Sequence, residues 1–281
     1  MCHRGWVNVL IDAATLNALP DVCILDVRYR LDKPDGRDDH AAVHIPGAVY
    51  VDLETELSQP GAPGDGRHPL PTLPVLQAAA RRWGIRPGQK VVAYDAGTSL
   101  GAGRAWWLLL AAGIANVQVL DGGLRAWTDA GFAVESGEYV PEPSRIELSD
   151  YVFPGGAIDI DEAAAWPGHG VLVDVRAAER FRGETEPMDP VAGHIPGAVN
   201  LPASRYVDPA SGMFATPAEI RAAFAEVGAT GDRPVAAYCG SGVTAAQAAL
   251  AAAIAGLDVA VYPGSWSQWS NTPGRPVAVG E

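Results

Sequence analysis

The sequence predicts an α/β protein of two tandem domains, each a mainly parallel sheet flanked by helices. The hexapeptide His-Ile-Pro-Gly-Ala-Val occurs twice, at residues 44–49 and 194–199. Each copy follows an apolar run that ends in Asp-Val-Arg, at residues 24–28 and 172–176. Short apolar runs alternate with stretches of helical length, which is the pattern of βαβ units. Because these features recur in the same order, we interpret the chain as a duplicated domain.

Eight short apolar runs, four in each half, predict the strands. The predicted strands are residues 22–27, 49–53, 91–94, 117–120, 171–175, 198–201, 235–238 and 259–262. Four longer stretches predict helices, at residues 71–83, 102–112, 217–227 and 243–255. Two segments rich in Gly, Pro and charge, residues 32–39 and 59–69, are predicted to be loops that reach towards the other domain.

A Pro-rich, polar stretch without periodicity separates the two halves at residues 137–144. We therefore predict a first domain at residues 1–136, a linker at 137–149 and a second domain at 150–281.

Composition narrows the classes of function. The 281 residues carry a formal net charge of -13, which argues against a general affinity for nucleic acid or anionic membranes. Three scattered cysteines, Cys2, Cys23 and Cys239, do not form a disulfide framework, so a cytoplasmic location is expected. The N-terminal residues lack the apolar core of a signal peptide, and no apolar run is long enough to span a bilayer. The six histidines show no metal-ligand spacing with cysteine, so we expect neither metal nor cofactor.

Cys239 is the most informative residue. It stands between an apolar run, residues 235–238, and the Ala-rich stretch 243–255, so the natural assignment is strand, tight loop and helix. Gly240 and Gly242 let the backbone fold closely around the sulfur, so that N–H groups and the helix N-terminus stabilise a thiolate. The alternative is a small buried cysteine that only packs ahead of a core helix.

The two halves differ at this position. Where the second half has Cys239, the first has Asp95. Only the second half can supply a thiolate nucleophile, so we expect one active site per chain and a non-catalytic first domain.

These motifs resemble the two-domain sulfurtransferases of the rhodanese superfamily, along nearly the whole chain. Within that superfamily a Cys-Gly-Ser-Gly-Val-Thr loop, here residues 239–244, is similar to the loop of 3-mercaptopyruvate sulfurtransferases. Members that prefer thiosulfate usually carry basic residues after the cysteine. The resemblance implies that Cys239 accepts a sulfane sulfur as a persulfide, that pyruvate leaves, and that a thiol such as that of thioredoxin, or cyanide, takes the sulfur. Thiosulfate is the alternative donor.

The resemblance also implies the residues that bind the anionic donor. The loop N–H donors expected to surround the persulfide belong to Gly240, Ser241, Gly242, Val243 and Thr244. Arg180 matches the family position that holds the substrate carboxylate or carbonyl, although such an arginine can also be a solvated surface residue. A second family arginine is missing, since Met188 stands in that stretch; Arg182 is the candidate to replace it.

Release of pyruvate requires a proton on its enolate. The resemblance assigns this relay to Ser241, His44 and Asp38. The alternative for His44 is a structural role in its turn, shared with His194 in the second copy.

The sequence argues against two other classes of protein. A cysteine phosphatase or arsenate reductase needs an arginine six residues after its cysteine, where this chain has Ala245. A rhodanese-like binding module without activity typically lacks the nucleophile, whereas Cys239 is present.

Overall fold

The structure, a computed structural model, describes residues 9–281 and comprises two compact units. The first unit contains the described residues up to Gln59, Leu70–Phe153 and Val207–Phe214, and the second contains Pro60–Pro69, Pro154–Tyr206 and Ala215–Glu281. Cys2 and the N-terminal residues used in the signal-peptide argument lie outside the described residues.

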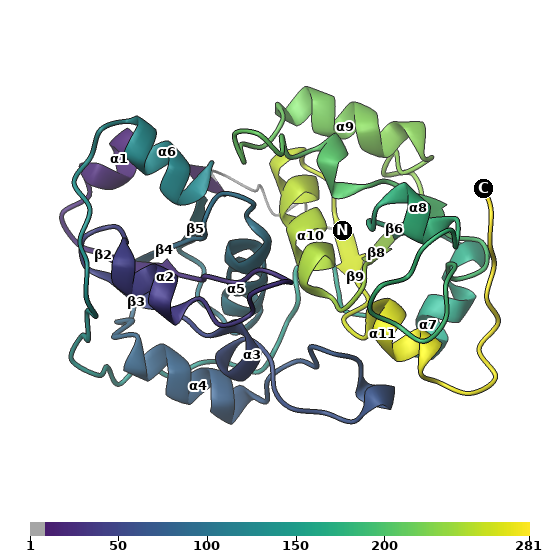
Figure 1. The fold of residues 1–281 in the computed structure, drawn as a ribbon, viewed down its shortest axis with the longest axis horizontal. Coiled ribbons are helices and arrows are strands. Elements are labelled where there is room, and N and C mark those ends of the chain that lie inside the picture. Colours follow the sequence, from purple (N-terminus) through teal and green to yellow (C-terminus); the bar gives the residue numbers. More distant parts are fainter. Residues whose placement is uncertain (1–8) are drawn as a thin grey trace. The chain divides into compact units, whose positions relative to one another are not determined.

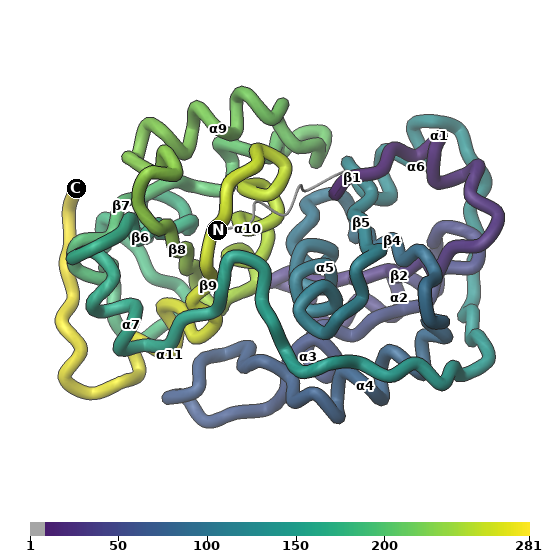
Figure 2. Tube along the Cα trace, turned by 180° about the vertical axis from the view of Figure 1, so that it is seen from behind, coloured from purple at the N-terminus to yellow at the C-terminus, as the bar shows by residue number. Residues whose placement is uncertain are grey.

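The compact units differ from the predicted contiguous division at 1–136, 137–149 and 150–281. Residues 137–149 belong to the first unit, where backbone bonds join Ser144 to Arg81 and Ser149 to Ala112. Figure 2 shows this segment passing along the helix that contains Arg81. Two further segments also depart from the predicted division: Pro60–Pro69 belongs to the second unit and Val207–Phe214 to the first. Polar segments without periodicity do not indicate which core they pack against, so the sequence could not assign them.

The first unit contains a five-stranded, wholly parallel sheet in the order β1-β5-β4-β2-β3 (Figure 1). Its strands are β1 (Leu10–Ile11), β2 (Val22–Asp26), β3 (Ala48–Tyr50), β4 (Lys90–Tyr94) and β5 (Val117–Leu120). Its helices are α1 (Ala13–Asn17), α2 (Arg37–Ala42), α3 (Leu53–Glu56), α4 (Leu73–Arg82), α5 (Leu100–Ala111) and α6 (Gly123–Asp129). The sequence missed β1, because two residues are too short to show a pattern.

The second unit contains a four-stranded parallel sheet in the order β7-β6-β8-β9 (Figure 1). Its strands are β6 (Val171–Asp174), β7 (Val199–Asn200), β8 (Val235–Tyr238) and β9 (Val259–Val261). Its α-helices are α7 (Ile160–Ala165), α8 (Ala178–Phe181), α9 (Pro217–Glu226), α10 (Val243–Ile254) and α11 (Ser265–Ser270). Three 3-10 turns complete it: η1 (Pro63–Asp65), η2 (Trp166–Gly168) and η3 (Ala203–Arg205). The predicted α/β class with two parallel sheets is confirmed.

The Asp-Val-Arg motif forms the same buried ion pair in both units. Arg28 Nε lies 2.7 Å from Asp26 Oδ1, and Arg176 Nη2 lies 2.6 Å from Asp174 Oδ2. Each guanidinium also donates to the carbonyl just before the repeated histidine, at 2.6 Å in the first unit and 2.7 Å in the second. The motif therefore fastens the end of a central strand to the His-Ile-Pro-Gly turn.

The repeated turn itself is held alike in both units. The isoleucine N–H donates to a buried tyrosine hydroxyl, that of Tyr94 at 3.1 Å or Tyr238 at 3.0 Å. His44 Nδ1 and His194 Nδ1 each lie 2.8 Å from a backbone carbonyl oxygen. These bonds give the repeated hexapeptide a structural role in both units.

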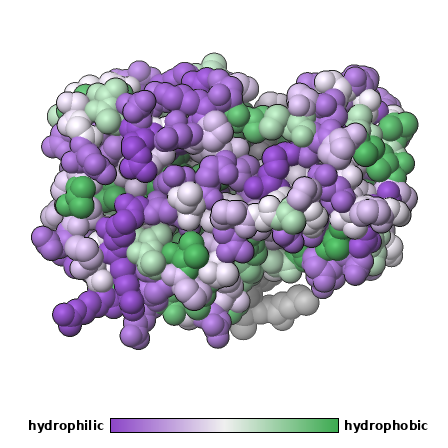
Figure 3. Space-filling model, turned by 60° about the horizontal axis from the view of Figure 1, so that its bottom comes forward, coloured by the Kyte–Doolittle hydropathy of each residue, from purple (hydrophilic) through white to green (hydrophobic). Residues whose placement is uncertain are grey.

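One face of the molecule is mainly polar. Figure 3 shows a face covered largely by hydrophilic side chains, with hydrophobic ones in small scattered groups. Among residues 9–281, no helix combines the length and apolar character required to cross a membrane.

Candidate active site

Cys239 directly follows the central strand β8, and α10 begins four residues later at Val243. Between them, Gly242 adopts φ +84° as the residue that precedes the helix. A Cβ atom on Gly242 would lie 2.4 Å from the carbonyl oxygen of Pro263, so a larger residue would be both strained and obstructed. The loop can therefore turn tightly only because this position is glycine.

Backbone and hydroxyl groups surround the sulfur. The N–H of Gly242 lies 3.1 Å from Cys239 Sγ and donates to it. Ser265 Oγ accepts the Cys239 N–H at 3.1 Å and lies 4.0 Å from Sγ. Cys239 is only 2% exposed. The Gly242 N–H and the N-terminus of the 12-residue helix α10 both direct partial positive charge at the sulfur.

The other predicted loop residues occupy the same turn. Gly240 and Ser241 complete it, while Val243 and Thr244 begin α10. Backbone bonds from Trp266 to the Cys239 carbonyl, 2.9 Å, and from Ser267 to the Gly240 carbonyl, 2.8 Å, fix its shape. Ser265, the first residue of α11, also belongs to the site through its bond with the Cys239 N–H, and no sequence motif predicted this.

Ser241 is paired with a histidine that no sequence motif singled out. His68 Nδ1 lies 2.7 Å from Ser241 Oγ, and both side chains are buried. His68 lies in Pro60–Pro69, which packs in the second unit with the cysteine loop. The one signal that could have identified His68 is its position in residues 59–69, the loop predicted to reach the other domain.

The histidine and aspartate predicted for the relay lie in the first unit. His44 is buried, with its ring stacked on His40 at 4.1 Å between centroids and Nδ1 2.8 Å from the His40 carbonyl oxygen. Asp38 lies in the first turn of α2, in a segment expected to be a loop. These contacts favour the structural alternative for His44, and the relay role of both residues stays a prediction.

Two arginines lie against the first glycine of the loop. A methyl group at the Cβ position of Gly240 would lie 3.1 Å from Arg67 Nη2 and 3.6 Å from Arg180 Nη1. Arg180 also donates to Glu186, with Nη2 2.6 Å from Oε1. Asp189 forms an ion pair with Arg67 and lies 3.5 Å from Arg180 Nη2. Two guanidinium groups, each paired with a carboxylate, therefore lie beside the cysteine loop.

Arg182, the predicted substitute for the missing arginine, points to a different partner. It follows α8 and forms a two-pronged ion pair with Glu184, at 2.7 and 2.9 Å, on the exposed surface. Met188 is exposed. Donor binding by Arg182 stays a prediction.

The equivalent loop of the first unit surrounds the side chain of Asp95 with backbone N–H groups. Asp95 occupies the position of Cys239, and its Oδ1 accepts the N–H groups of Gly97, Thr98 and Ser99, each at 2.9 Å. Its Oδ2 accepts the Gly101 N–H at 3.2 Å. The carboxylate oxygens thus fill a ring of converging backbone donors.

Cys23, the other described cysteine, has a contrasting environment in β2. Burial raises the pKa of its thiol to about 12. Unfolded cysteine ionises near pH 8.5, so above about that pH the unfolded chain loses a proton that the folded chain keeps. We expect this residue to lower the free energy of unfolding by about 1.4 kcal/mol per pH unit in that window. Urea titrations should therefore show a steeper decline for the wild type than for Cys23→Ala as pH rises from about 8.5 to about 10; parallel curves would contradict this.

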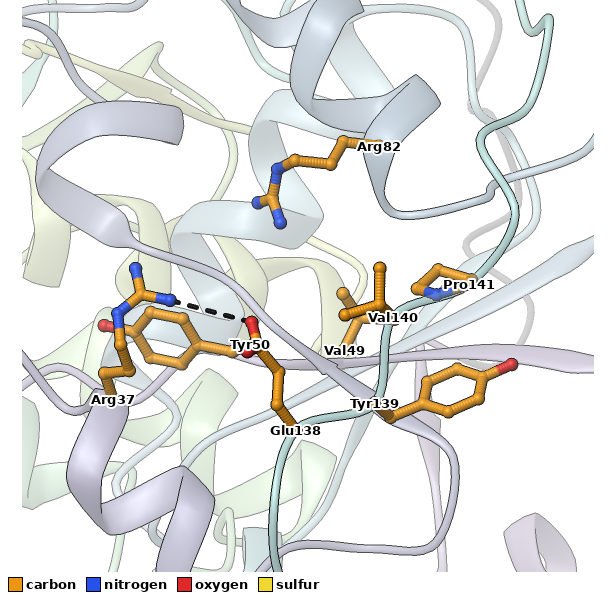
Figure 4. A pocket seen from close by; sticks show the side chains of 8 residues that line it. All are labelled: Arg37, Val49, Tyr50, Arg82, Glu138, Tyr139, Val140 and Pro141. Atoms are coloured by element: carbon orange, nitrogen blue, oxygen red, sulfur yellow. Dashed lines mark ion pairs between the residues drawn. The ribbon is translucent and has the colours of Figure 1, made fainter.

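A separate pocket in the first unit is too small for a substrate. Its lining residues are Arg37, Val49, Tyr50, Arg82, Glu138, Tyr139, Val140 and Pro141 (Figure 4). Its volume of about 20 Å³ is enough for roughly one water molecule. Arg37 lies over the Tyr50 ring and pairs with Glu138 at 4.0 Å, which closes one side of the pocket.

Within the described part of the chain, no group of three or more His, Cys, Asp or Glu side chains is arranged to hold a metal ion.

The fold and site define a duplicated α/β protein in which one copy presents a cysteine, with a backbone N–H donated to its sulfur, at the carboxyl end of a central parallel strand. The chain belongs to the rhodanese family, since the model of the Rhodanese-like domain matches residues 9–130 and 159–272.

Named relatives and a solved structure agree with this family. The chain is 46% identical to "Putative thiosulfate sulfurtransferase SseB" of Mycobacterium tuberculosis, over 100% of this chain and 99% of that protein. It is 42% identical to "Probable 3-mercaptopyruvate sulfurtransferase" of Pseudomonas aeruginosa, over 93% and 94% of the two chains. The structure of 3-mercaptopyruvate sulfurtransferase from Leishmania major matches with a TM-score of 0.84 and 29% identity, covering 96% of this chain and 76% of the other.

Proposed function

We propose that this chain is a sulfurtransferase that takes a sulfane sulfur from 3-mercaptopyruvate onto Cys239 and passes it to a thiol or to cyanide. The observation that carries the proposal is the Cys239 loop, where a backbone N–H lies 3.1 Å from the sulfur and Ser241 is bonded to His68. The relatives named for sulfur transfer support it.

In the first step the Cys239 thiolate attacks the donor sulfur. A sulfur–sulfur bond forms, the carbon–sulfur bond breaks, and its electron pair goes to the pyruvate enolate. The donor's thiol proton ends on the enolate carbon, so donor and thiolate become pyruvate and a persulfide anion with no further reactant. We assign the transfer of that proton to the Ser241–His68 pair, whose 2.7 Å contact suits a general acid–base relay.

The persulfide carries its charge on the outer sulfur. The loop N–H groups stabilise this charge as an oxyanion hole stabilises an alkoxide. The Asp95 loop is the support for this step, because the related loop of the first unit binds a carboxylate through four backbone donors. Arg180 holds the donor carboxylate at Gly240.

In the second step an acceptor takes the outer sulfur and regenerates the Cys239 thiolate. A thiol such as that of thioredoxin, or cyanide, has the nucleophilicity for this attack on a persulfide. The small number of cysteines in the sequence supports a cytoplasmic setting for this thiol chemistry.

The test is to incubate the purified chain with 3-mercaptopyruvate and, separately, with thiosulfate. We expect pyruvate release and a mass gain of about 32 Da at Cys239 with 3-mercaptopyruvate. Thiosulfate is the second candidate donor, because the relative of Mycobacterium tuberculosis carries that name. An adduct and sulfite from thiosulfate alone would make it the donor, and no adduct from either would contradict sulfur transfer.

A further inference from the structure

Arg67 lies beside the cysteine loop together with Arg180. Unlike Arg180, it was not suggested by any pattern in the sequence. It lies in Pro60–Pro69, next to His68, within the second unit. Its backbone N–H donates to Ser267 Oγ at 3.0 Å, and Ser267 in turn donates its own N–H to the Gly240 carbonyl at 2.8 Å. The backbone of Arg67 is therefore tied to the cysteine loop through one residue.

The side chain of Arg67 has donor capacity left over. Nη1 pairs with Asp189, and Nη2 is the atom nearest to the Cβ position of Gly240. Nε is buried and has no hydrogen-bond partner among the described residues. An unpaired buried donor on a charged group is costly, and an anion bound beside Nη2 at Gly240 would offset part of that cost.

The neighbouring arginines are more fully engaged. Arg176 is 2% exposed and holds both Asp174 and Glu186, while Arg180 is 16% exposed and holds Glu186. The Arg67 side chain is 26% exposed, the most exposed of the three.

We propose that Arg67 is the second cation of the donor site, supplied by the Pro60–Pro69 segment in place of the arginine that is missing near Met188. Asp189 holds the guanidinium at the loop, and Arg67 and Arg180 together bind the carboxylate end of the donor beside Gly240. This assignment deepens the proposed function and rests on it for the identity of the donor. Arg67 would then determine specificity for the donor by binding the carboxylate of an α-keto acid.

The test measures binding without turnover, in a Cys239→Ala background. Calorimetry with 3-mercaptopyruvate should show that Arg67→Gln raises Kd by about tenfold or more, because a charge-assisted hydrogen bond is lost. Arg67→Lys, which keeps the charge but not the fork, should bind with an intermediate Kd. Arg205→Gln is the matched control, since Arg205 pairs with Glu226 on the exposed surface; its Kd should equal that of the background.

The variant Arg67→Gln/Asp189→Asn separates ligand binding from a structural role. If Arg67 only neutralises Asp189, removing both charges restores the background Kd and overturns the proposal. If Arg67 binds the donor, the double variant stays about tenfold weaker. An unchanged Kd in Arg67→Gln would also overturn it. A wild-type protein that forms no persulfide, with Arg67-dependent binding intact, would refute the proposed function and leave this assignment standing.

Discussion

Cys239→Ala should abolish sulfur transfer, with turnover on 3-mercaptopyruvate reduced by at least about a thousandfold. Cys239 is the described cysteine that has a donor N–H on its sulfur, at 3.1 Å, and lies at the end of the central strand β8. Without the thiolate no persulfide forms. The measurement is pyruvate release, together with the intact mass of the protein after incubation with the donor.

Cys23→Ala is the matched control for this experiment. Cys23 is buried in β2, where its pKa is raised to about 12, so its thiol stays protonated at neutral pH. We expect this variant to keep the turnover and the mass gain of the wild type. Persistent turnover in Cys239→Ala, or an adduct that maps to Cys23, would contradict the assignment of the nucleophile.

His68→Gln should lower kcat on 3-mercaptopyruvate by about a hundredfold or more, since general acid–base catalysis contributes on that order. The reason is chemical: cleavage of the carbon–sulfur bond leaves an enolate that must receive a proton. Thiosulfate leaves as sulfite and needs no proton at carbon. Initial rates on the two donors should therefore diverge in this variant, with thiosulfate much less affected.

Ser241→Ala should reproduce this donor-dependent loss, because Ser241 Oγ is the atom bonded to His68 at 2.7 Å. His169→Gln, a change at an exposed histidine, serves as the control and should retain wild-type rates on both donors. Equal losses on both donors in His68→Gln would show that His68 supports the loop rather than the proton transfer.

The sequence predicted most of the fold because its elements are short-range patterns. The repeated hexapeptide and the Asp-Val-Arg runs revealed the duplication, and the structure shows that both belong to one hydrogen-bonded arrangement present in each unit. The elements it missed have little local signal. Strand β1 has only two residues. The strand predicted over residues 49–53 ends at Tyr50, because Asp52 accepts the N–H of Glu54 at 2.9 Å and so caps helix α3, which begins at Leu53.

The site was predictable only in part. Cys239 and its loop could be read from neighbouring residues, because the strand, the glycines and the helix are contiguous in the chain. His68 could not, since it meets Ser241 across 173 positions of sequence. The resemblance led to His44 instead, whose contacts in the first unit belong to the repeated turn.

By itself, the sequence determined the duplicated α/β architecture and predicted the Cys239 nucleophile and its single reactive loop, because each depends on residues close together in the chain or repeated within it. The tertiary structure decided which histidine bonds to Ser241 and which arginines flank Gly240. Both His68 and Arg67 come from Pro60–Pro69, a Gly- and Pro-rich segment without periodicity. Where such a segment packs depends on long-range hydrogen bonds and ion pairs, here with Ser241, Ser267 and Asp189, and these have no signature in local sequence.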